Sequence, residues 1–291
     1  MFDPSIIWAS VLNGLTTGAI YALIALGLTL IYGVLHIVNF AHGSALMVAM
    51  YGVYFLFVKA HVDPYMALPL MIAAMFAFGY LLQRVVIARA ARGNEQSVLL
   101  VTLGISIVLT NLALFAFKSD TNTIDTPYSL QTVDILGAAI ALPKVVAFFG
   151  ALAVAALLLV LINWTSLGRA IRAVSREQRG ARVVGIDVER IYALSFGIGL
   201  ACLGAAACFL LPAYYVNPQV GDDFVLIAFT IVVLGGMGSF MGALWGGLII
   251  GVVESLGGLW FGDSLGQMGI FLLFVAVLAF RPQGMFGRKG A

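Results

Sequence analysis

Long runs of apolar residues follow one another along the whole chain and are separated by short polar stretches. The runs lie at about residues 6–34, 37–58, 66–88, 97–117, 145–163, 189–215, 224–257 and 266–280. Within each run the apolar residues are continuous and do not alternate with polar ones, which favours helices over the strands of a membrane barrel. Because about 20 apolar residues span a bilayer as a helix, most of these runs predict one membrane crossing each.

The run at 224–257 is too long for a single crossing. It contains the stretch LGGMGS, from Leu234 to Ser239, which combines glycines with a polar residue. We therefore expect two short crossings joined by an irregular break, which gives nine passes, or eight if one piece only re-enters the membrane. The sequence predicts an all-α polytopic membrane protein with eight or nine transmembrane helices, some of them broken, in a single transmembrane domain over residues 1–291.

The composition supports a membrane protein. Of the 291 residues, 62% are hydrophobic and only 10% are charged, whereas about 25% are charged in a typical soluble domain. Cys202 and Cys208 lie six residues apart in one apolar run, so a helix directs their side chains differently. They are not expected to form a disulfide framework or a metal site.

The basic residues gather in a few segments between the runs, and this sets the expected orientation. Three clusters follow the third, fifth and last runs: Arg84, Arg89 and Arg92; the five arginines between Arg169 and Arg182; and Arg281, Arg288 and Lys289. The segment 118–144 carries Asp120, Asp125 and Asp134 against Lys118 and Lys144, and Asp222 and Asp223 are expected in another outer loop. Since basic segments stay in the cytoplasm, we predict that the three clusters are cytoplasmic and that the amino terminus lies outside.

Two interruptions by glycine and polar residues suggest an internal repeat. NFAHGSA, from Asn39 to Ala45, ends one long run, and VLGGMGSFMGA, from Val233 to Ala243, breaks another. Irregular backbone at membrane depth is tolerated where it lines a watery cavity or is buried in protein, and paired interruptions indicate a transport path. The alternative is that the glycines only allow close helix packing. The residues predicted to border a path are Asn39, His42, Gly43, Gly235, Gly236, Gly238 and Ser239.

The chain carries little that would support catalysis. His36, His42 and Glu254 are its few ionisable residues near the predicted spans, and no HExxH or GxxxxGK motif occurs. We expect no enzyme activity, no catalytic residue, no metal site and no cofactor in this chain. A series of acidic residues within the spans, typical of proton or sodium coupling, is also lacking.

The segment GRAIRAVSREQRGARVVGID, from Gly168 to Asp187, holds five of the fifteen basic residues. Arg169, Arg172, Arg176 and Arg179 are spaced three, four and three apart, which predicts one face of a short amphipathic helix, with Ile171, Val174 and Ala181 on another face. Such a helix either anchors at an anionic lipid surface or docks on a cytoplasmic partner. We favour docking by a segment at about 164–188, and the residues predicted to take part are Gly168, Arg169, Arg172, Ala173, Arg176 and Gly185.

Four stretches of the sequence resemble one known family. They are NGLTTGAIYALIALGLTLIYGVLHIVNFAHG (13–43), the arginine segment, VLGGMGSFMGALWGGLIIG (233–251) and the tail RPQGMFG (281–287). They look like the permease subunits of branched-chain amino acid ABC importers of the LivH type, and the resemblance covers nearly the whole chain in order. It implies a multi-pass protein of the bacterial inner membrane.

The resemblance also implies partners. These are a second, similar permease, two cytoplasmic ATPases that use ATP and Mg, and a periplasmic substrate-binding protein; no nucleic acid is expected. By analogy, the arginine segment is the coupling segment that contacts an ATPase. The resulting expectation is the membrane-spanning subunit of an ATP-driven importer of branched-chain or other hydrophobic amino acids. The alternatives are an importer permease for urea, amides or aromatic acids, a stand-alone secondary carrier or channel, and a pure scaffold subunit.

Overall fold

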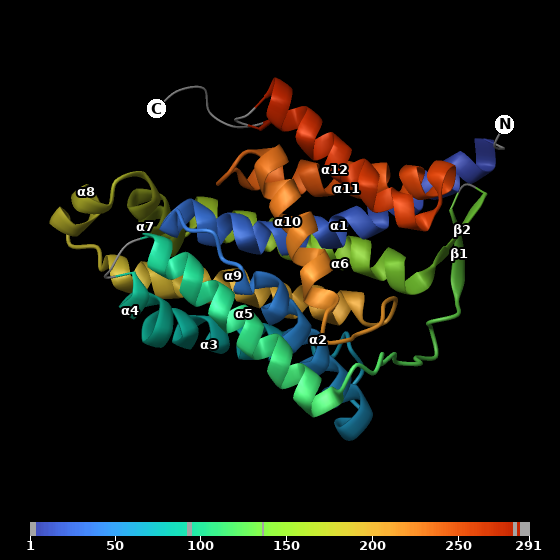
Figure 1. Cartoon of the computed structure of the whole chain (residues 1–291), viewed down its shortest axis with the longest axis horizontal. Coiled ribbons are helices and arrows are strands. Elements are labelled where there is room, and N and C mark those ends of the chain that lie inside the picture. Colours follow the sequence, from blue (N-terminus) through green and yellow to red (C-terminus); the bar gives the residue numbers. More distant parts are fainter. Residues whose placement is uncertain (1–3, 92–94, 136, 282–283, 286–291) are drawn as a thin grey trace.

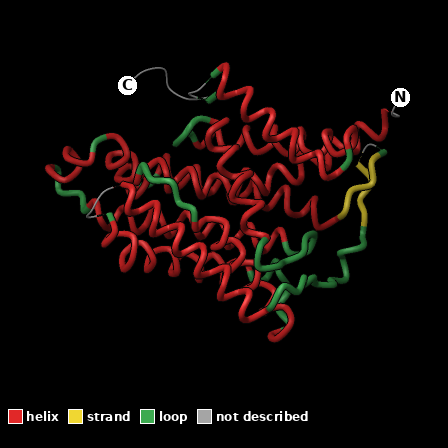
Figure 2. The backbone as a smooth tube through the Cα atoms, viewed as in Figure 1, coloured by secondary structure: helices red, strands yellow, loops and turns green. Residues whose placement is uncertain are grey.

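The computed structural model describes residues 4–91, 95–135, 137–281 and 284–285, and helices make up most of it (Figures 1 and 2). In chain order the helices are α1 (Pro4–Leu35), α2 (Ala41–Ala60), α3 (Leu68–Leu82), the π-helical turn η1 (Gln83–Ile87), α4 (Ala88–Ala90), α5 (Glu95–Phe117), α6 (Leu142–Trp164), α7 (Ser166–Arg176), α8 (Gln178–Val183), α9 (Val188–Leu210), α10 (Val220–Gly235), α11 (Phe240–Phe261) and α12 (Asp263–Phe280). One antiparallel hairpin, β1 (Thr132–Ile135) and β2 (Ala138–Ala141), precedes α6. The prediction of an all-α architecture is confirmed, apart from this hairpin.

Seven helices of the described chain are long and apolar enough to cross a membrane. They are α1, α2, α3 continued by η1 and α4, α5, α6, α9 and α11. By comparison, α10 has 16 residues, and the apolar stretch of α12 covers only Met268–Val277. The long run 224–257 divides into α10 and α11, as predicted. Within the described residues seven helices are of spanning length, and the count of eight or nine passes stays a prediction.

The bundle has two chemically different ends. We call the end at which α7 and α8 lie the arginine end, and the opposite one, with β1 and β2, the hairpin end (Figure 1). α1 starts near β2 and finishes beside α7, where the Ser175 hydroxyl donates a hydrogen bond to the Gly33 carbonyl. The remaining described members of the three basic clusters, Arg84, Arg89 and Arg281, lie at the arginine end too, whereas the 118–144 segment lies at the hairpin end (Figure 1).

Helix α1 forms the centre of the core. Its residues from Gly18 to Ile31 are all buried, and it packs on α11, α9, α6 and α10. Close approach depends on small residues: a Cβ on Gly14 would stand 2.6 Å from the Gly251 carbonyl oxygen, and one on Gly18 would stand 2.7 Å from that of Gly247. The glycines of α1 and α11 therefore serve close helix packing.

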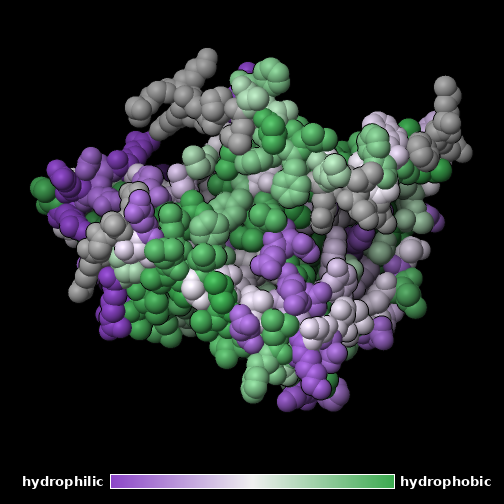
Figure 3. All heavy atoms as spheres, viewed as in Figure 1, coloured by the Kyte–Doolittle hydropathy of each residue, from purple (hydrophilic) through white to green (hydrophobic). Residues whose placement is uncertain are grey.

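The surface between the two ends is mostly apolar. Figure 3 shows hydrophobic side chains over much of this face between the two ends and hydrophilic ones gathered over α7 and α8. On α5, for example, Leu112 is 59% exposed and Phe115 is 89% exposed. A surface of this kind suits contact with lipid tails, because apolar side chains cost nothing there.

Candidate functional site

Two helices, α2 and α10, begin inside the bundle and not at one of its ends. After α1 ends, residues 36–40 lead back into the bundle, and the first turn of α2 places the His42 Nε2 atom 3.0 Å from the Ile24 carbonyl oxygen. After α9 ends, residues 211–219 turn back in the same way, and the Phe224 ring in α10 lies 5.9 Å from the Tyr21 ring. Because Tyr21 and Ile24 lie in the interior of α1, both helices begin near half depth.

The first turns of α2 and α10 touch through their backbones. A Cβ on Gly43 would overlap the Gly221 carbonyl, and a Cβ on Gly221 would overlap the Gly43 carbonyl. From this contact the two helices run in opposite directions, α2 toward the hairpin end and α10 toward the arginine end (Figure 1). Their amino termini, which carry partial positive charge, thus meet in the middle of the bundle.

The polar residues at the start of α2 are buried. Asn39 is 1% exposed and His42 is 0% exposed. The Asn39 Oδ1 atom accepts a hydrogen bond of 3.1 Å from the amide of Ala41, the first residue of α2. The Asn39 Nδ2 and His42 Nδ1 atoms have no partner within the described chain. The structure therefore brings Asn39, His42 and Gly43 together at half depth, close to α10.

The start of α10 exposes charge at this depth. Asp222 and Asp223 stand in its first turn and are both exposed, and Figure 3 shows a hydrophilic patch in the middle of this face, where α10 begins. The prediction of an outer loop for these two residues is wrong, because residues 211–219 re-enter the bundle. Carboxylates at membrane depth are costly against lipid, and they usually face the interior of an assembly or water.

The second predicted break lies elsewhere. Gly236 and Gly238 have φ of 94° and 83°, and with Gly235 and Ser239 they form the turn between α10 and α11. This turn lies at the arginine end, where Gly238 stands beside Gly33 and the Met285 amide donates to the Leu234 carbonyl at 2.7 Å. The Ser239 Oγ atom accepts from the Gly242 amide at 3.1 Å and so caps α11. The two predicted breaks are therefore not brought together. The segment that lies against the first break, Asn39–Gly43, is the one that leads to Gly221.

The sequence contains a signal for this overlooked element. In NPQVGDD, from Asn217 to Asp223, proline and glycine separate two apolar runs, and two acidic residues then occupy the first turn of a helix. Acidic residues are favoured in the first turn because they complement the helix dipole.

The arginine segment is held firmly against the bundle. The Thr165 hydroxyl accepts from the Gly168 amide at 3.0 Å and caps α7, and Ile171, Val174 and Ala181 are buried. A Cβ on Gly168 would overlap the Ile162 carbonyl at the end of α6. The apolar face predicted for this segment is therefore the face that packs on the bundle.

The segment differs from the prediction in two respects. It is not one helix, because Glu177 has extended backbone angles and separates α7 from α8. Arg179 is therefore not on the same helix as Arg169, although both are exposed. In addition, the Arg172 guanidinium donates to the Ile162 carbonyl, so this side chain contacts its own subunit. Arg169, Arg176, Arg179 and Arg182 remain exposed, while Ala173 is half-buried and Gly185, with φ of 85°, follows α8.

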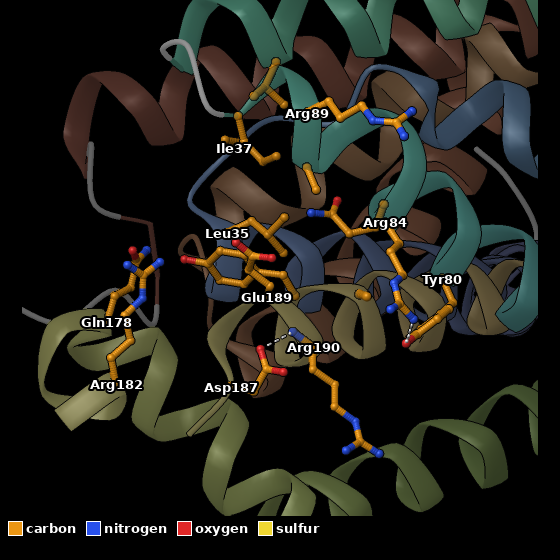
Figure 4. A pocket seen from close by; sticks show the side chains of 16 residues that line it. Leu35, Ile37, Tyr80, Arg84, Arg89, Gln178, Arg182, Asp187, Glu189 and Arg190 are labelled. Carbon is orange, nitrogen blue, oxygen red and sulfur yellow. Dashed lines mark hydrogen bonds between the residues drawn. The ribbon is translucent and has the colours of Figure 1, made fainter. Parts of the chain in front are cut away.

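A cavity of about 1030 Å³ opens at the arginine end, beside α8 (Figure 4). Its walls come from η1 and α4, from α8, and from the start of α9. Four arginines and two carboxylates line it: Arg84, Arg89, Arg182, Arg190, Asp187 and Glu189. Leu35, Ile37, Val98 and the rings of Tyr80 and Tyr192 supply apolar surface, and the buried Gln83 also lines it.

A smaller polar cluster joins two loops at the hairpin end. The Tyr128 hydroxyl donates to the Asp63 carboxylate at 2.8 Å, and the Tyr128 ring stacks on Tyr65 with centroids 5.3 Å apart. Burial, helped by Asp63, raises the pKa of Tyr65 to about 12. Burial and the hydrogen bond to Asp63 also raise the pKa of Tyr128. This cluster ties the segment after α5 to the α2–α3 loop.

Nothing within the described chain resembles a metal centre, since no group of three or more His, Cys, Asp and Glu residues is placed to hold an ion. Cys202 and Cys208 are buried free thiols. The candidate site is therefore the half-depth junction of α2 and α10, together with the arginine segment and its neighbouring cavity.

Comparison with known proteins gives a consistent picture. The family model described as the permease component of branched-chain amino acid transport systems matches residues 10–278. The high-affinity branched-chain amino acid transport system permease protein BraD of Pseudomonas aeruginosa is 36% identical over 95% of this chain and 94% of its own length. LivH of Escherichia coli K12, which has the same description, is 33% identical over 95% of this chain and 94% of its own. No solved structure matches the chain.

Proposed function

The chain belongs to the family of branched-chain amino acid transport system permease components, and from this premise we propose that it is the membrane-spanning subunit of an ATP-driven importer of branched-chain or other hydrophobic amino acids. A second permease subunit would complete the path across the bacterial inner membrane. Two ATPases would bind the arginine end, and a periplasmic binding protein would deliver the substrate at the hairpin end.

The half-depth junction of α2 and α10 is the observation that carries this proposal. Two short helices that begin inside a bundle, with opposite directions, are typical of transporters, where such helix starts border the substrate path. Asp222 and Asp223 are exposed at this junction. Charged side chains at this depth need water or a polar partner, and a path shared with a second permease supplies both. The Asp222 and Asp223 carboxylates and the polar groups of Asn39 and His42 would then face or support the passing amino acid.

The arginine end fits the supply of energy from outside the chain. Arg169, Arg176 and Arg179 present guanidinium groups to the solvent, while the apolar face of α7 is fixed on α1 and α6. A segment seated in this way transmits a push from a bound ATPase to the helices that surround the junction. The same arrangement is not needed by a stand-alone carrier or channel.

Reconstitution tests the proposed function. The permease is purified with its partner permease and ATPases, placed in lipid vesicles, and supplied with the binding protein and labelled leucine. We expect uptake that requires ATP on the side of the vesicle membrane to which the ATPases are bound. Uptake should stop when the ATPases are left out. Uptake of leucine by the permease without ATP would instead assign a carrier or channel. Competition by urea, amides or aromatic acids, in place of leucine, would assign one of those substrate classes.

A further inference from the structure

The cavity beside α8 lies outside the predicted coupling residues and has the chemistry of a protein contact. Its apolar surface is surrounded by charged side chains, with an excess of two positive charges from four arginines over two carboxylates. Interfaces commonly combine an apolar pocket with a polar rim, and arginine and tyrosine are enriched at their strongest contacts. This cavity has both residue types.

The arginines do not converge on one point. Figure 4 shows the guanidinium groups of Arg89, Arg182 and Arg190 pointing in different directions around Leu35 and Glu189, while Arg84 turns to Tyr80. The Arg84 guanidinium donates to the Tyr80 hydroxyl at 3.2 Å, and within the described chain no ion pair engages any of the four arginines. Scattered cations suit an extended acidic surface better than a single small anion.

The floor of the cavity contains an unused acceptor. Gln83 is 2% exposed, and its Oε1 atom has no partner within the described chain. Leaving a buried acceptor unpaired is unfavourable, and a donor from a bound partner would remove this cost. Gln83 is also the first residue of η1, and single π-helical turns are frequent at functional sites.

We propose that this cavity receives an apolar side chain, flanked by acidic residues, from the partner ATPase, so that the ATPase contacts η1, α4 and the start of α9 as well as α7. The inference depends on the proposed function, because it takes the ATPase as the partner. Two features support this occupant over others: α8 forms one wall, so the cavity continues the surface of the arginine segment, and the positive excess is complementary to an acidic surface. Through this contact, a movement of α3 or α9 would change the surface that the ATPase binds.

The test compares cavity variants with matched controls in the co-expressed complex. Ala91→Trp fills the cavity from an exposed turn position, and Val85→Trp adds the same ring to an exposed position in η1 that does not line it. The double change Arg89→Glu with Arg190→Glu reverses the charge excess, and Lys118→Glu reverses a charge at the hairpin end. Gln83→Leu keeps the size of the side chain and removes the unused acceptor.

The measurements are the amount of ATPase recovered with the permease in detergent and the size-exclusion profile of the permease itself. We expect Ala91→Trp and the double reversal to lower ATPase recovery by about tenfold or more, and Gln83→Leu to lower it with no loss of permease stability, while both controls match the wild type. Equal recovery from all variants would overturn the proposal.

Two further outcomes separate the alternatives. If the cavity variants keep the ATPases but lose bound phospholipid phosphorus, the occupant is a lipid and the proposal is wrong. If the wild-type permease itself recovers no ATPase and transports without ATP, the proposed function is wrong. This outcome is seen in the wild type, whereas a failure of the cavity proposal is seen only in the cavity variants.

Discussion

The backbone of Gly43, in the first turn of α2, lies directly against the backbone of Gly221, in the first turn of α10. These residues are far apart in the chain, and their contact joins the two helices that begin inside the bundle. Since each carbonyl occupies the place where the other residue would carry a Cβ, the contact admits glycine only. The half-depth junction therefore depends on the lack of a Cβ atom at both Gly43 and Gly221.

Gly43→Ala should break this junction. The added methyl group overlaps a backbone carbonyl that cannot rotate away, so we expect destabilisation at or above the upper end of the about 1–3 kcal/mol typical of overpacked cores, together with loss of transport. Thermal unfolding of the purified permease in detergent measures the first effect. The control is Gly104→Ala in α5, where an added Cβ meets nothing within 4 Å; a similar loss in both variants would show that glycine content alone, and not the contact, is responsible.

Asp222 and Asp223 should be reachable from water in the assembled transporter. A cysteine placed at either position is expected to react with a water-soluble thiol reagent, because only a hydrated thiol forms the reactive thiolate. Leucine should slow the reaction if the residues face the path. The wild type serves as the blank, since Cys202 and Cys208 are buried, and Leu112→Cys on the exposed apolar face of α5 supplies a lipid-facing comparison. Equally slow reaction at Asp222 and Leu112 would contradict a watery path at the start of α10.

The tyrosine cluster at the hairpin end predicts sensitivity to alkali. The pKa of Tyr65 is raised to about 12 and that of Tyr128 is raised as well, whereas an unfolded tyrosine titrates near about 10. The folded state therefore prefers the neutral phenols. This stabilisation is fully present below about pH 10 and is lost as the pH rises through the folded pKa values toward about 12.

Thermal unfolding across that pH range checks the sign. Tyr128→Phe should show a smaller fall in unfolding temperature between about pH 10 and about pH 12 than the wild type, because one titrating group is gone. The exposed Tyr215→Phe should behave as the wild type. A steeper fall in Tyr128→Phe would show that the cluster does not hold its protons in the folded state.

The sequence predicted the architecture well because membrane helices leave a strong local signal. Continuous apolar runs predicted the helices, and Leu234–Ser239 predicted the division between α10 and α11. The basic clusters predicted which segments share one end of the bundle. Each of these depends on composition within one segment, which the bilayer constrains directly.

The half-depth junction was not predictable in the same way. Residues 211–215, LPAYY, carry no charge and extend the apolar run 189–215 past the end of α9, so the run alone does not reveal that the chain reverses after Leu210. The reversal is fixed by contacts with distant residues, such as the Phe224 ring on Tyr21. Likewise, the regular arginine spacing predicted one helix, although Glu177 interrupts it by capping α8 with its own side chain.

Gly168 provides a test of how α7 is seated. Gly168→Ala would place a Cβ on the Ile162 carbonyl, and Gly180→Ala, also in the arginine segment, would meet only the flexible Glu177 side chain at 3.2 Å. We expect the first variant to insert normally but to lose most ATPase binding, because α7 moves away from α6. The second should bind the ATPases as the wild type does. Equal binding by both would show that the position of α7 is not important for the partner.

Arg172 and Arg176 should separate seating from docking. The Arg172 guanidinium donates to the Ile162 carbonyl at the end of α6, where a positive charge complements the free carbonyls of the helix terminus. Arg176 is exposed and at the end of α7. The spacing of the arginines in the sequence predicted the same role for both residues, but the structure gives them different surroundings.

Arg172→Glu should therefore destabilise the isolated permease by about 1–3 kcal/mol, because a carboxylate replaces the donor beside carbonyl oxygens, whereas Arg172→Lys should restore part of the loss. Arg176→Glu should change the stability by less than about 0.5 kcal/mol and yet reduce ATPase recovery, since its exposed charge would meet the proposed partner. Thermal unfolding of the permease alone and ATPase recovery from the complex give the two measurements. If Arg176→Glu retains the ATPases while Arg172→Glu loses them only in proportion to its lost stability, the exposed arginines are a lipid anchor, and the coupling role assigned to this segment is wrong.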